Sequence, residues 1–280
     1  WVENRLNAPL EVKKAFQFLH SNDPRTKRDG EGYIPSDQLY VLSPDSQKIN
    51  FKKAKRFTRS EMMVMEMLST NEWQRPIYFA VTIGSDYHLG LDPYLELTGL
   101  AYRITPERSQ DGRPRVNTEV MYDNMLHKFK YGNMNIPGIY IDENTMRMCR
   151  THRMMFMELV EALYNEGKHD KCLETLDFAE KMLPGYNIPY DYTSATMASY
   201  YYQLGEMEKG NAIMTKVADN CAEYLAWGAS LDKEHRASSQ STTGHYMAVM
   251  GYVLQNFERY QQKELFNHYY DIYVQYASMR

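Results

Sequence analysis

The sequence has no long apolar run, little net charge and few cysteines. Its longest stretch without Asp, Glu, Lys or Arg, residues 237–257, is rich in Ser, Thr, Gln and Asn, whereas a bilayer-spanning helix needs about 20 mostly apolar residues. No signal-peptide pattern is present. The 32 basic and 36 acidic residues give a formal charge of −4, without an extended basic stripe. Nucleic acid is therefore not an expected partner.

Signatures of catalysis and metal binding are also absent. The three cysteines, Cys149, Cys172 and Cys221, are odd in number and form no Cys-x-x-Cys pair, so we expect buried, unpaired thiols. The two-histidine zinc motif, the Gly-rich phosphate loop and the Gly-x-Ser-x-Gly nucleophile elbow do not occur. We predict that this chain holds no catalytic residue, no metal and no cofactor.

The first half of the sequence predicts short strands mixed with helices. Thr58 and Glu61 fit a capping box, which indicates a helix over 59–70. Two β-rich runs, 76–83 and 97–104, flank a loop that contains Gly and Pro, and we expect them to pair as strands. Further predicted elements are a helix over 9–19, a strand over 38–42 and a helix over 118–131.

From residue 142 onward the pattern is that of repeated helices. Apolar stripes before and after Gly167 predict one helical hairpin, and those around Gly205 predict a second. The two glycines are 38 residues apart, near the 34-residue tetratricopeptide period. Helices expected over 244–258 and 262–277 would cap these two repeats. The polar segment 228–243 is predicted to be a surface loop.

These patterns together predict an α+β chain with two regions. Residues 1–141 are expected to form an α+β region with a short sheet. Residues 142–280 are expected to form a helical tetratricopeptide-like region. Two repeats are fewer than the three or so that make a self-sufficient stack, so other parts of the chain must cover its ends.

The loop 84–96 is the strongest candidate for a ligand site. Carboxylates and an imidazole lie within it, and a loop between two strands can gather such groups around a cation or a sugar. The alternative is a structural loop satisfied by its own backbone. Two arginines at the edges of the strand runs offer either a fixed ion pair or an anion contact. The candidate ligand-binding residues are Arg75, Asp86, Tyr87, His88, Asp92, Tyr94 and Arg103.

The helical region offers a second kind of site. Stacked helical hairpins form extended concave surfaces that bind partner proteins. Tyr164 and Tyr201, on the predicted hairpins, are the candidate partner-binding residues. The 24 tyrosines and 19 methionines otherwise predict helix packing, with a partner-binding surface as the alternative.

Several sequence segments resemble those of a known family. They are the segments 71–84 (Asn-Glu-Trp-Gln-Arg-Pro-Ile-Tyr-Phe-Ala-Val-Thr-Ile-Gly), 97–106, 121–125 and 140–144. They are similar to the soluble C-terminal region of a bacterial family of multi-spanning membrane proteins of unknown function. That family is related to protein O-mannosyltransferase-like membrane glycosyltransferases. The resemblance implies that a transmembrane bundle carries any catalysis and that this region lies on the extracytoplasmic, periplasmic face of the inner membrane.

Because residue 1 is Trp instead of an initiator Met, we expect the chain to begin inside a longer gene product or after removal of a leader. We therefore expect a non-catalytic accessory region whose partners are its own transmembrane domain and a protein or glycan acceptor. Two alternatives stay open at this point. The first is carbohydrate binding by the loop 84–96, and the second is a structural lid on the membrane domain.

Overall fold

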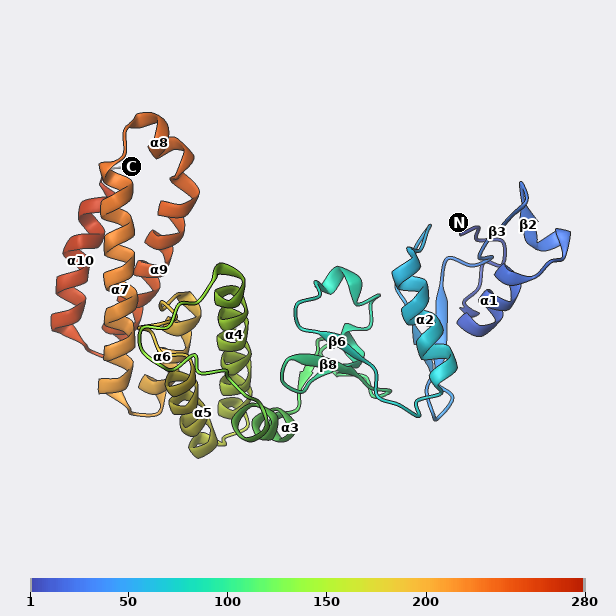
Figure 1. Ribbon diagram of the computed structural model, residues 1–280, viewed down its shortest axis with the longest axis horizontal. Coiled ribbons are helices and arrows are strands. Elements are labelled where there is room, and N and C mark those ends of the chain that lie inside the picture. The colour runs from blue at the N-terminus through green and yellow to red at the C-terminus, as the bar shows by residue number, and fades with distance from the viewer. Residues whose placement is uncertain (1, 279–280) are drawn as a thin grey trace. The chain divides into compact units, whose positions relative to one another are not determined.

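The computed structural model describes residues 2–278, which form two compact units divided after Asn124 (Figure 1). The first unit combines short strands with helices and the second is built from helices, which confirms the predicted α+β class. The predicted change of character at residue 142 coincides with the start of the first long helix of the second unit. No helix among the described residues is long and apolar enough to cross a membrane.

A small sheet with two helices forms the N-terminal part of the first unit. Its elements are β1 (Leu10–Glu11), α1 (Val12–His20), β4 (Leu39–Leu42), β5 (Lys48–Asn50) and α2 (Arg59–Asn71). The strand order is β1-β4-β5, with β1 parallel and β5 antiparallel to β4. Both helices pack on β4 and on each other. The strands β2 (Lys27–Arg28) and β3 (Glu31–Gly32) form a separate hairpin after a 3-10 turn, η1 (Pro24–Thr26).

Helix α2 begins at the predicted capping box. The Glu61 backbone N–H donates to the Thr58 hydroxyl at 3.3 Å, and the Thr58 N–H donates to the Glu61 carboxylate at 2.7 Å. Two of the N–H groups that a helix start leaves unpaired are thereby satisfied. Met65 and Leu68 then face the core of this unit.

The second sheet contains β6 (Tyr78–Ala80), β7 (Leu95–Leu97), β8 (Ala101–Ile104) and β9 (Arg115–Val116) in the order β6-β8-β7-β9. The predicted pairing of the two β-rich runs is confirmed, because β6 is antiparallel to β8. The prediction of one strand over 97–104 is wrong. The chain reverses at Gly99, whose φ of 137° is unfavourable for other residues, so β7 and β8 form a hairpin.

The predicted helix over 118–131 is shorter than expected. Helix α3 (Thr118–Asp123) passes directly into a π-helical segment, Asn124–Lys128. Its N-cap is Asn117, whose side chain accepts from the Val120 N–H at 3.1 Å.

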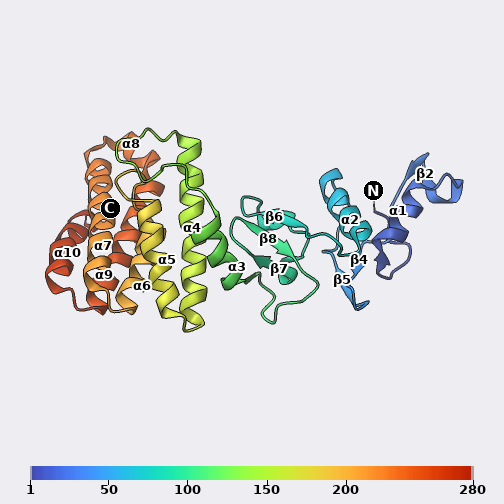
Figure 2. The same ribbon diagram turned by 60° about the horizontal axis from the view of Figure 1, so that its bottom comes forward.

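The second unit consists of α4 (Glu143–Asn165), α5 (His169–Met182), α6 (Tyr192–Gln203), α7 (Met207–Ser230), α8 (Lys233–Ser238), α9 (Gln240–Arg259) and α10 (Lys263–Ala277). Helix α4 packs on α5 and α6, α7 packs on α6 and α9, and α10 packs on α7 and α9. Figure 2 shows these helices side by side. Their packed faces bury apolar side chains, and the three cysteines are buried and unpaired among them.

Three hairpins in this unit share one turn geometry. The connections α4/α5, α6/α7 and α9/α10 are each three residues long, and the middle residue is Gly167, Gly205 or Gln261 with φ of 73°, 86° or 58°. In each turn an N–H reaches back five residues to a helix carbonyl, as in a Schellman motif. These bonds run from Lys168 to Leu163 (2.9 Å), from Glu206 to Tyr201 (2.9 Å) and from Gln262 to Phe257 (2.8 Å).

The predicted surface loop over 228–243 is wrong. Helix α7 continues to Ser230, α8 occupies most of the segment, and α9 already starts at Gln240. Gly228 is buried inside α7, and a Cβ there would overlap the Thr243 side chain of α9. This glycine therefore permits close helix packing instead of ending a helix.

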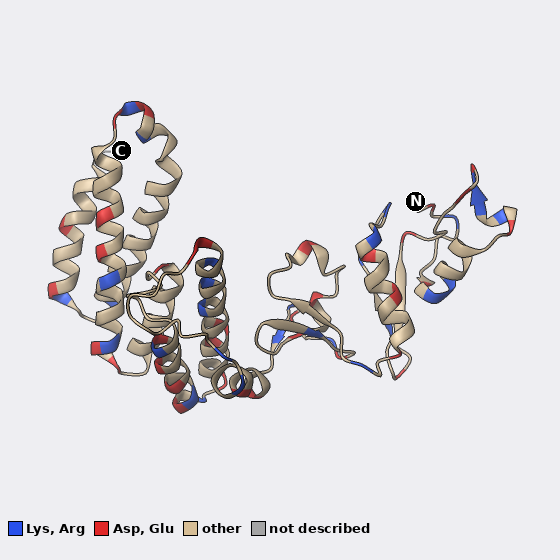
Figure 3. Cartoon of the chain, viewed as in Figure 1, with Lys and Arg blue, Asp and Glu red and all other residues tan. Residues whose placement is uncertain are grey.

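Acidic and basic side chains are interspersed along the helices of the second unit and along the strands of the first (Figure 3). The two-residue strand β2 is wholly basic, whereas the long helices of the second unit carry both signs.

Candidate functional site

The loop 84–96 lines a cavity of the first unit. It contains two 3-10 turns, η2 (Ser85–Tyr87) and η3 (Asp92–Tyr94), and runs from the end of β6 to the start of β7. Asp86 and Asp92 both line a cavity of about 470 Å³. Lys52 and Arg113 add two cations to the same wall. The predicted residues that do meet at one cavity are thus these two carboxylates.

His88 does not line this cavity. Its side chain is buried, stacks on Phe79 at a centroid distance of 5.2 Å and meets the Tyr102 ring edge at 5.6 Å. Its Nδ1 lies 2.8 Å from the Asp92 carboxylate, while its Nε2 is buried without a hydrogen-bond partner in the described residues. The geometry therefore lets Nδ1–H donate to Asp92, whereas a proton on Nε2 would lack an acceptor. His88 therefore anchors the loop to the sheet.

Lys52 binds the loop on both sides of His88. Its backbone N–H donates to the Leu89 carbonyl at 2.8 Å and its ammonium donates to the Asp86 carbonyl at 2.6 Å. Gly90 has φ of 80°, and a Cβ there would lie 3.1 Å from the Lys52 nitrogen. These contacts hold the middle of the loop against Lys52.

Tyr87 and Tyr94 occupy different environments. Tyr87 is 62% exposed, whereas Tyr94 is half-buried and packs on the apolar core. The Tyr94 carbonyl accepts from the Thr105 N–H at 2.8 Å. Only Tyr87 is free to meet a large partner.

Arg75 and Arg103 form no ion pair in the described part of the chain, so the structure does not join the two strands through them. Arg75 is exposed, and its backbone is held by the Asn71 side chain. Arg103 is exposed on β8. The cation near Glu96 is instead Arg115 of β9, at 4.0 Å. The described residues contain no group of three or more His, Cys, Asp or Glu side chains arranged to hold a metal ion.

The second unit contains a larger cleft, which we call the α5/α7 cleft. Its volume is about 710 Å³, within the usual range for ligand sites. One of its walls is the link between α5 and α6. Its lining residues are Asp177, Glu180, Pro184, Gly185, Tyr186, Pro189, Tyr190, Tyr201, Lys209, Ala212, Ile213, Lys216 and Asn220.

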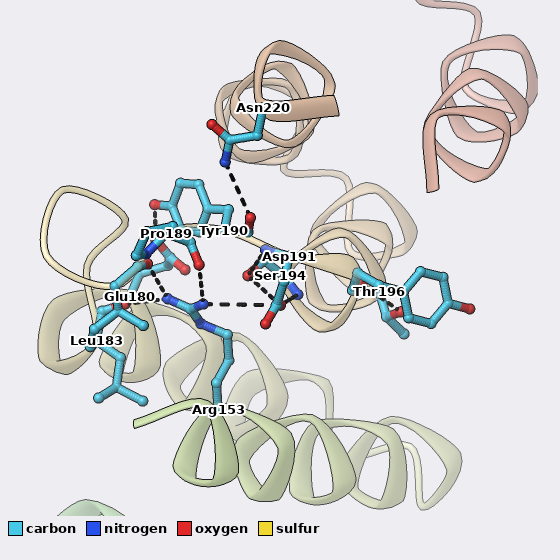
Figure 4. A network of polar contacts seen from close by, with 11 residues as sticks. Arg153, Glu180, Leu183, Pro189, Tyr190, Asp191, Ser194, Thr196 and Asn220 are labelled. Atoms are coloured by element: carbon cyan, nitrogen blue, oxygen red, sulfur yellow. Dashed lines mark hydrogen bonds and ion pairs between the residues drawn. The ribbon is translucent and has the colours of Figure 1, made fainter. Parts of the chain in front are cut away.

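A buried arginine holds this link in place (Figure 4). The Arg153 side chain is 2% exposed, and its guanidinium donates to the carbonyls of Leu183, Ile188 and Pro189 at 3.0, 2.8 and 3.0 Å. Its ion pair is a 4.0 Å contact with Asp191. Burial lowers the pKa of Arg153, and Asp191 opposes that shift. The arginine therefore acts as an internal clamp between α4 and the link.

Glu180 and Tyr190 face the cleft from two of its walls. The Tyr190 hydroxyl donates to the Glu180 carboxylate at 2.5 Å, and the Arg153 guanidinium lies 5.5 Å from the centre of the Tyr190 ring. Burial raises the pKa of the Glu180 carboxyl, while the Tyr190 hydrogen bond and Arg153 lower it. A Cβ on Gly185 would overlap the Tyr190 ring, so only glycine lets the ring take this place.

Tyr201, a predicted partner-binding residue, is 2% exposed and belongs to the wall of the same cleft. Its hydroxyl donates to Asp177 at 2.9 Å. The Lys209 ammonium bonds both Asp177 oxygens, at 2.8 and 2.9 Å, and lies 5.6 Å from the centre of the Tyr201 ring. Replacing Tyr201 with Ala would therefore open the core as well as change the cleft.

Tyr164, the other predicted partner-binding residue, takes part in one of several separate tyrosine ring contacts between helices of this unit. Its ring meets Tyr200 of α6 at 5.3 Å, Tyr192 of α6 meets Tyr252 of α9 at 5.2 Å, and Tyr246 of α9 stacks on Tyr224 of α7 at 4.0 Å. Burial, together with the neighbouring Glu161, raises the pKa of Tyr200 to about 12. We call these six rings the aromatic belt: Tyr164, Tyr192, Tyr200, Tyr224, Tyr246 and Tyr252.

The sequence did not point to Arg153, Glu180 or Tyr190. One signal was available for Arg153, because it occupies the apolar stripe of α4 between Cys149 and Phe156. A charged residue at a core position is buried only when it is paired.

Comparison with known proteins gave one match. The family described as TMEM260-associated domain 2 matches residues 32–120, which include the second sheet and the loop 84–96. That family has no known function. Neither the curated proteins nor the solved structures yielded a match.

Proposed function

We propose that this chain is a non-catalytic, partner-binding region of a larger membrane glycosyltransferase-like protein, and that its helical unit binds a protein segment. The observation that carries the proposal is the aromatic belt. Its ring contacts join four helices, and two of its members remain widely open to solvent, Tyr192 at 48% and Tyr224 at 46% exposed.

Exposed aromatic rings are the side chains that partner surfaces favour, because each buries a large area at low cost in conformational entropy. Trp227, 47% exposed, extends the belt beside Tyr224 with a centroid distance of 6.5 Å. The three hairpins with one turn geometry support a tetratricopeptide-like stack, whose role in other proteins is to present such surfaces.

The charge beside the belt indicates the chemistry of the partner. Glu158 and Glu161 lie on α4, and burial together with the Glu161 charge raises the pKa of the Glu158 carboxyl. Glu161 also acts on the Tyr200 hydroxyl of the belt, and a carboxylate beside a tyrosine ring favours a basic segment. We infer a partner segment that carries Lys or Arg.

Two observations bear on the parent protein. The family match connects residues 32–120 by name with TMEM260, and the phrases at 71–84 and 140–144 resemble membrane glycosyltransferase-like proteins. On this basis the parent supplies the membrane domain, and the present units lie on its extracytoplasmic, periplasmic side. The acceptor protein of the parent is the expected partner.

A photo-crosslinking experiment in the full-length parent tests the proposal. A benzophenone amino acid replaces Tyr192 or Tyr224 in the belt, and Tyr270 of α10, which is 46% exposed, provides the matched control. We expect discrete protein adducts from the two belt positions and none from Tyr270. Equal labelling at all three positions contradicts the proposal. An absence of adducts, combined with lost stability of the membrane domain on truncation, would instead favour a structural lid.

Carbohydrate binding at the loop 84–96 is the second candidate. The cavity of about 470 Å³ lined by Asp86 and Asp92 favours it, since carboxylates accept hydroxyl hydrogens and Lys52 holds the middle of the loop. Calorimetric titration of the chain with free and lipid-linked glycans tests this candidate. The Asp86→Asn variant is expected to lose the heat of glycan binding measured for the wild type.

A further inference from the structure

The α5/α7 cleft carries a more specific inference, which rests on the proposed function because it identifies what the helical unit recognises. We propose that this cleft binds the side chain of one Lys or Arg of an extended partner segment, with Glu180 as the counter-ion.

The pairing of charges around the cleft leaves one carboxylate over. Lys209 is bonded to both oxygens of Asp177, and the Lys216 ammonium lies 3.8 Å from Asp219. The buried Arg153 is paired with Asp191, and its guanidinium donates to the carbonyls of Leu183, Ile188 and Pro189. Glu180 lines the cleft and, among residues 2–278, accepts a hydrogen bond from the Tyr190 hydroxyl alone.

A carboxylate has about four acceptor positions, so Glu180 can take further donors from a ligand. Burial raises the pKa of the Glu180 carboxyl, and Arg153, the cation that lowers it, is shared with Asp191. An incoming ammonium or guanidinium would add a second cation. The side-chain oxygen of Asn220, whose nitrogen already donates to the Tyr190 carbonyl at 3.2 Å, offers a second acceptor.

The rings of the cleft suit the same ligand. Tyr186, Tyr190 and Tyr201 all contribute to the lining. Aromatic faces attract cations, and the protein itself already places Lys209 over Tyr201 and Arg153 over Tyr190. An alkyl chain that ends in a cation would lie along the rings and place its charge at Glu180.

The walls are fixed in advance. Arg153 clamps the link from within, Gly185 leaves room for the Tyr190 ring, and the Tyr186 hydroxyl donates to the Asn135 carbonyl at 2.6 Å. A preformed cleft loses little conformational entropy on binding, which favours recognition of a single side chain.

Methyl NMR of the full chain tests the proposal directly. Ile213 lines the cleft and Ile49 lies in the first unit, so their δ1 methyl signals serve as reporter and control. The probes are Nα-acetyl-lysine methylamide, the arginine analogue, and the neutral norleucine analogue of similar length. We expect the two cationic probes to shift Ile213 saturably, and the norleucine probe to bind at least about tenfold more weakly.

Two variants separate recognition from folding. Glu180→Gln is expected to weaken the cationic probes about tenfold or more, whereas Glu258→Gln, which removes an exposed charge from α9, leaves binding unchanged. Tyr190→Phe keeps the ring but removes the donor to Glu180, so it is expected to tighten binding. If Tyr190→Phe weakens binding, the hydroxyl and carboxylate act only in the fold and the proposal is wrong.

Three other results would overturn the inference. They are equal binding of the norleucine probe, unchanged affinity in Glu180→Gln, and a silent Ile213 methyl. A Glu180-dependent shift with a neutral disaccharide, and none with the cations, would assign the cleft to a saccharide. If belt positions still crosslink a partner while Ile213 stays silent, the partner-binding function stands and only the inference about the cleft fails.

Discussion

Replacing Arg153 tests how the helical unit is held together. Arg153→Met keeps most of the side-chain volume but removes the guanidinium that serves three carbonyls. Each unsatisfied buried carbonyl costs about 1–3 kcal/mol, so three of them give a loss of about 3 kcal/mol or more. Relief of the buried charge offsets part of this loss, and measured changes for broken buried pairs are about 3–5 kcal/mol. We expect a net destabilisation of about 3 kcal/mol.

The measurement must resolve the two units, because a chain with two compact parts need not unfold in one step. Hydrogen exchange read by mass spectrometry along a urea series gives separate stabilities for peptides from each unit. Peptides from α5 and α6 should open at lower urea in Arg153→Met, and peptides from α2 should not change. Arg150→Met, an exposed arginine of the same helix, is the matched control. A loss below about 1 kcal/mol, or a gain, would refute the clamp and show that the apolar replacement packs as well as the charged one.

Three further changes follow from the same structure. Gln261→Gly should stabilise the α9/α10 hairpin by about 1 kcal/mol in urea unfolding, because a non-glycine residue with φ of 58° is strained; an unchanged midpoint would contradict this. Thr58→Ala should lower the stability of α2 by about 1 kcal/mol, read from exchange of its first turn, with Thr58→Ser, which keeps the hydroxyl, as control. Glu180→Gln should flatten the pH dependence: the folded-state pKa is raised above 4.5, so the native state binds more protons and wild-type stability falls as pH rises above about 4.5. An identical slope in the variant would rule out Glu180 as its source.

Local patterns predicted the parts of the fold that local interactions decide. The capping box of α2 needs only two residues three apart, and the turns at Gly167 and Gly205 need only a residue that accepts positive φ. The third hairpin turn contains Gln261 instead of glycine, so its likeness to the other two could not be seen in the sequence. There the packing of α9 on α10 imposes the conformation that glycine would favour.

Tertiary packing decided what the sequence did not show. The segment 228–243 has the composition of a loop, yet close approach of α7 and α9 at Gly228 and Thr243 keeps both helices continuous there. Tertiary packing also decided which residues of the loop 84–96 face its cavity. His88 satisfies the pattern of a ligand-binding loop, but its ring is buried between Phe79 and Tyr102. Sequence position cannot tell an anchoring histidine from a binding one, because the difference lies in neighbours from other strands.

The Arg153 clamp and the α5/α7 cleft depend on the same link between α5 and α6, so a change in the clamp should also affect binding in the cleft. Arg153 binds the inner side of the link through the Leu183 and Ile188 carbonyls, and Tyr190 presents its outer side to Glu180. A loosened link would move the Tyr190 ring before it unfolded any helix. Binding of the cationic probes in the cleft, read from the Ile213 methyl signal, should therefore weaken in Arg153→Met. This should hold even at urea concentrations where hydrogen exchange shows α5 and α6 to be folded. Unchanged binding under those conditions would mean that the clamp stabilises the fold without shaping the cleft.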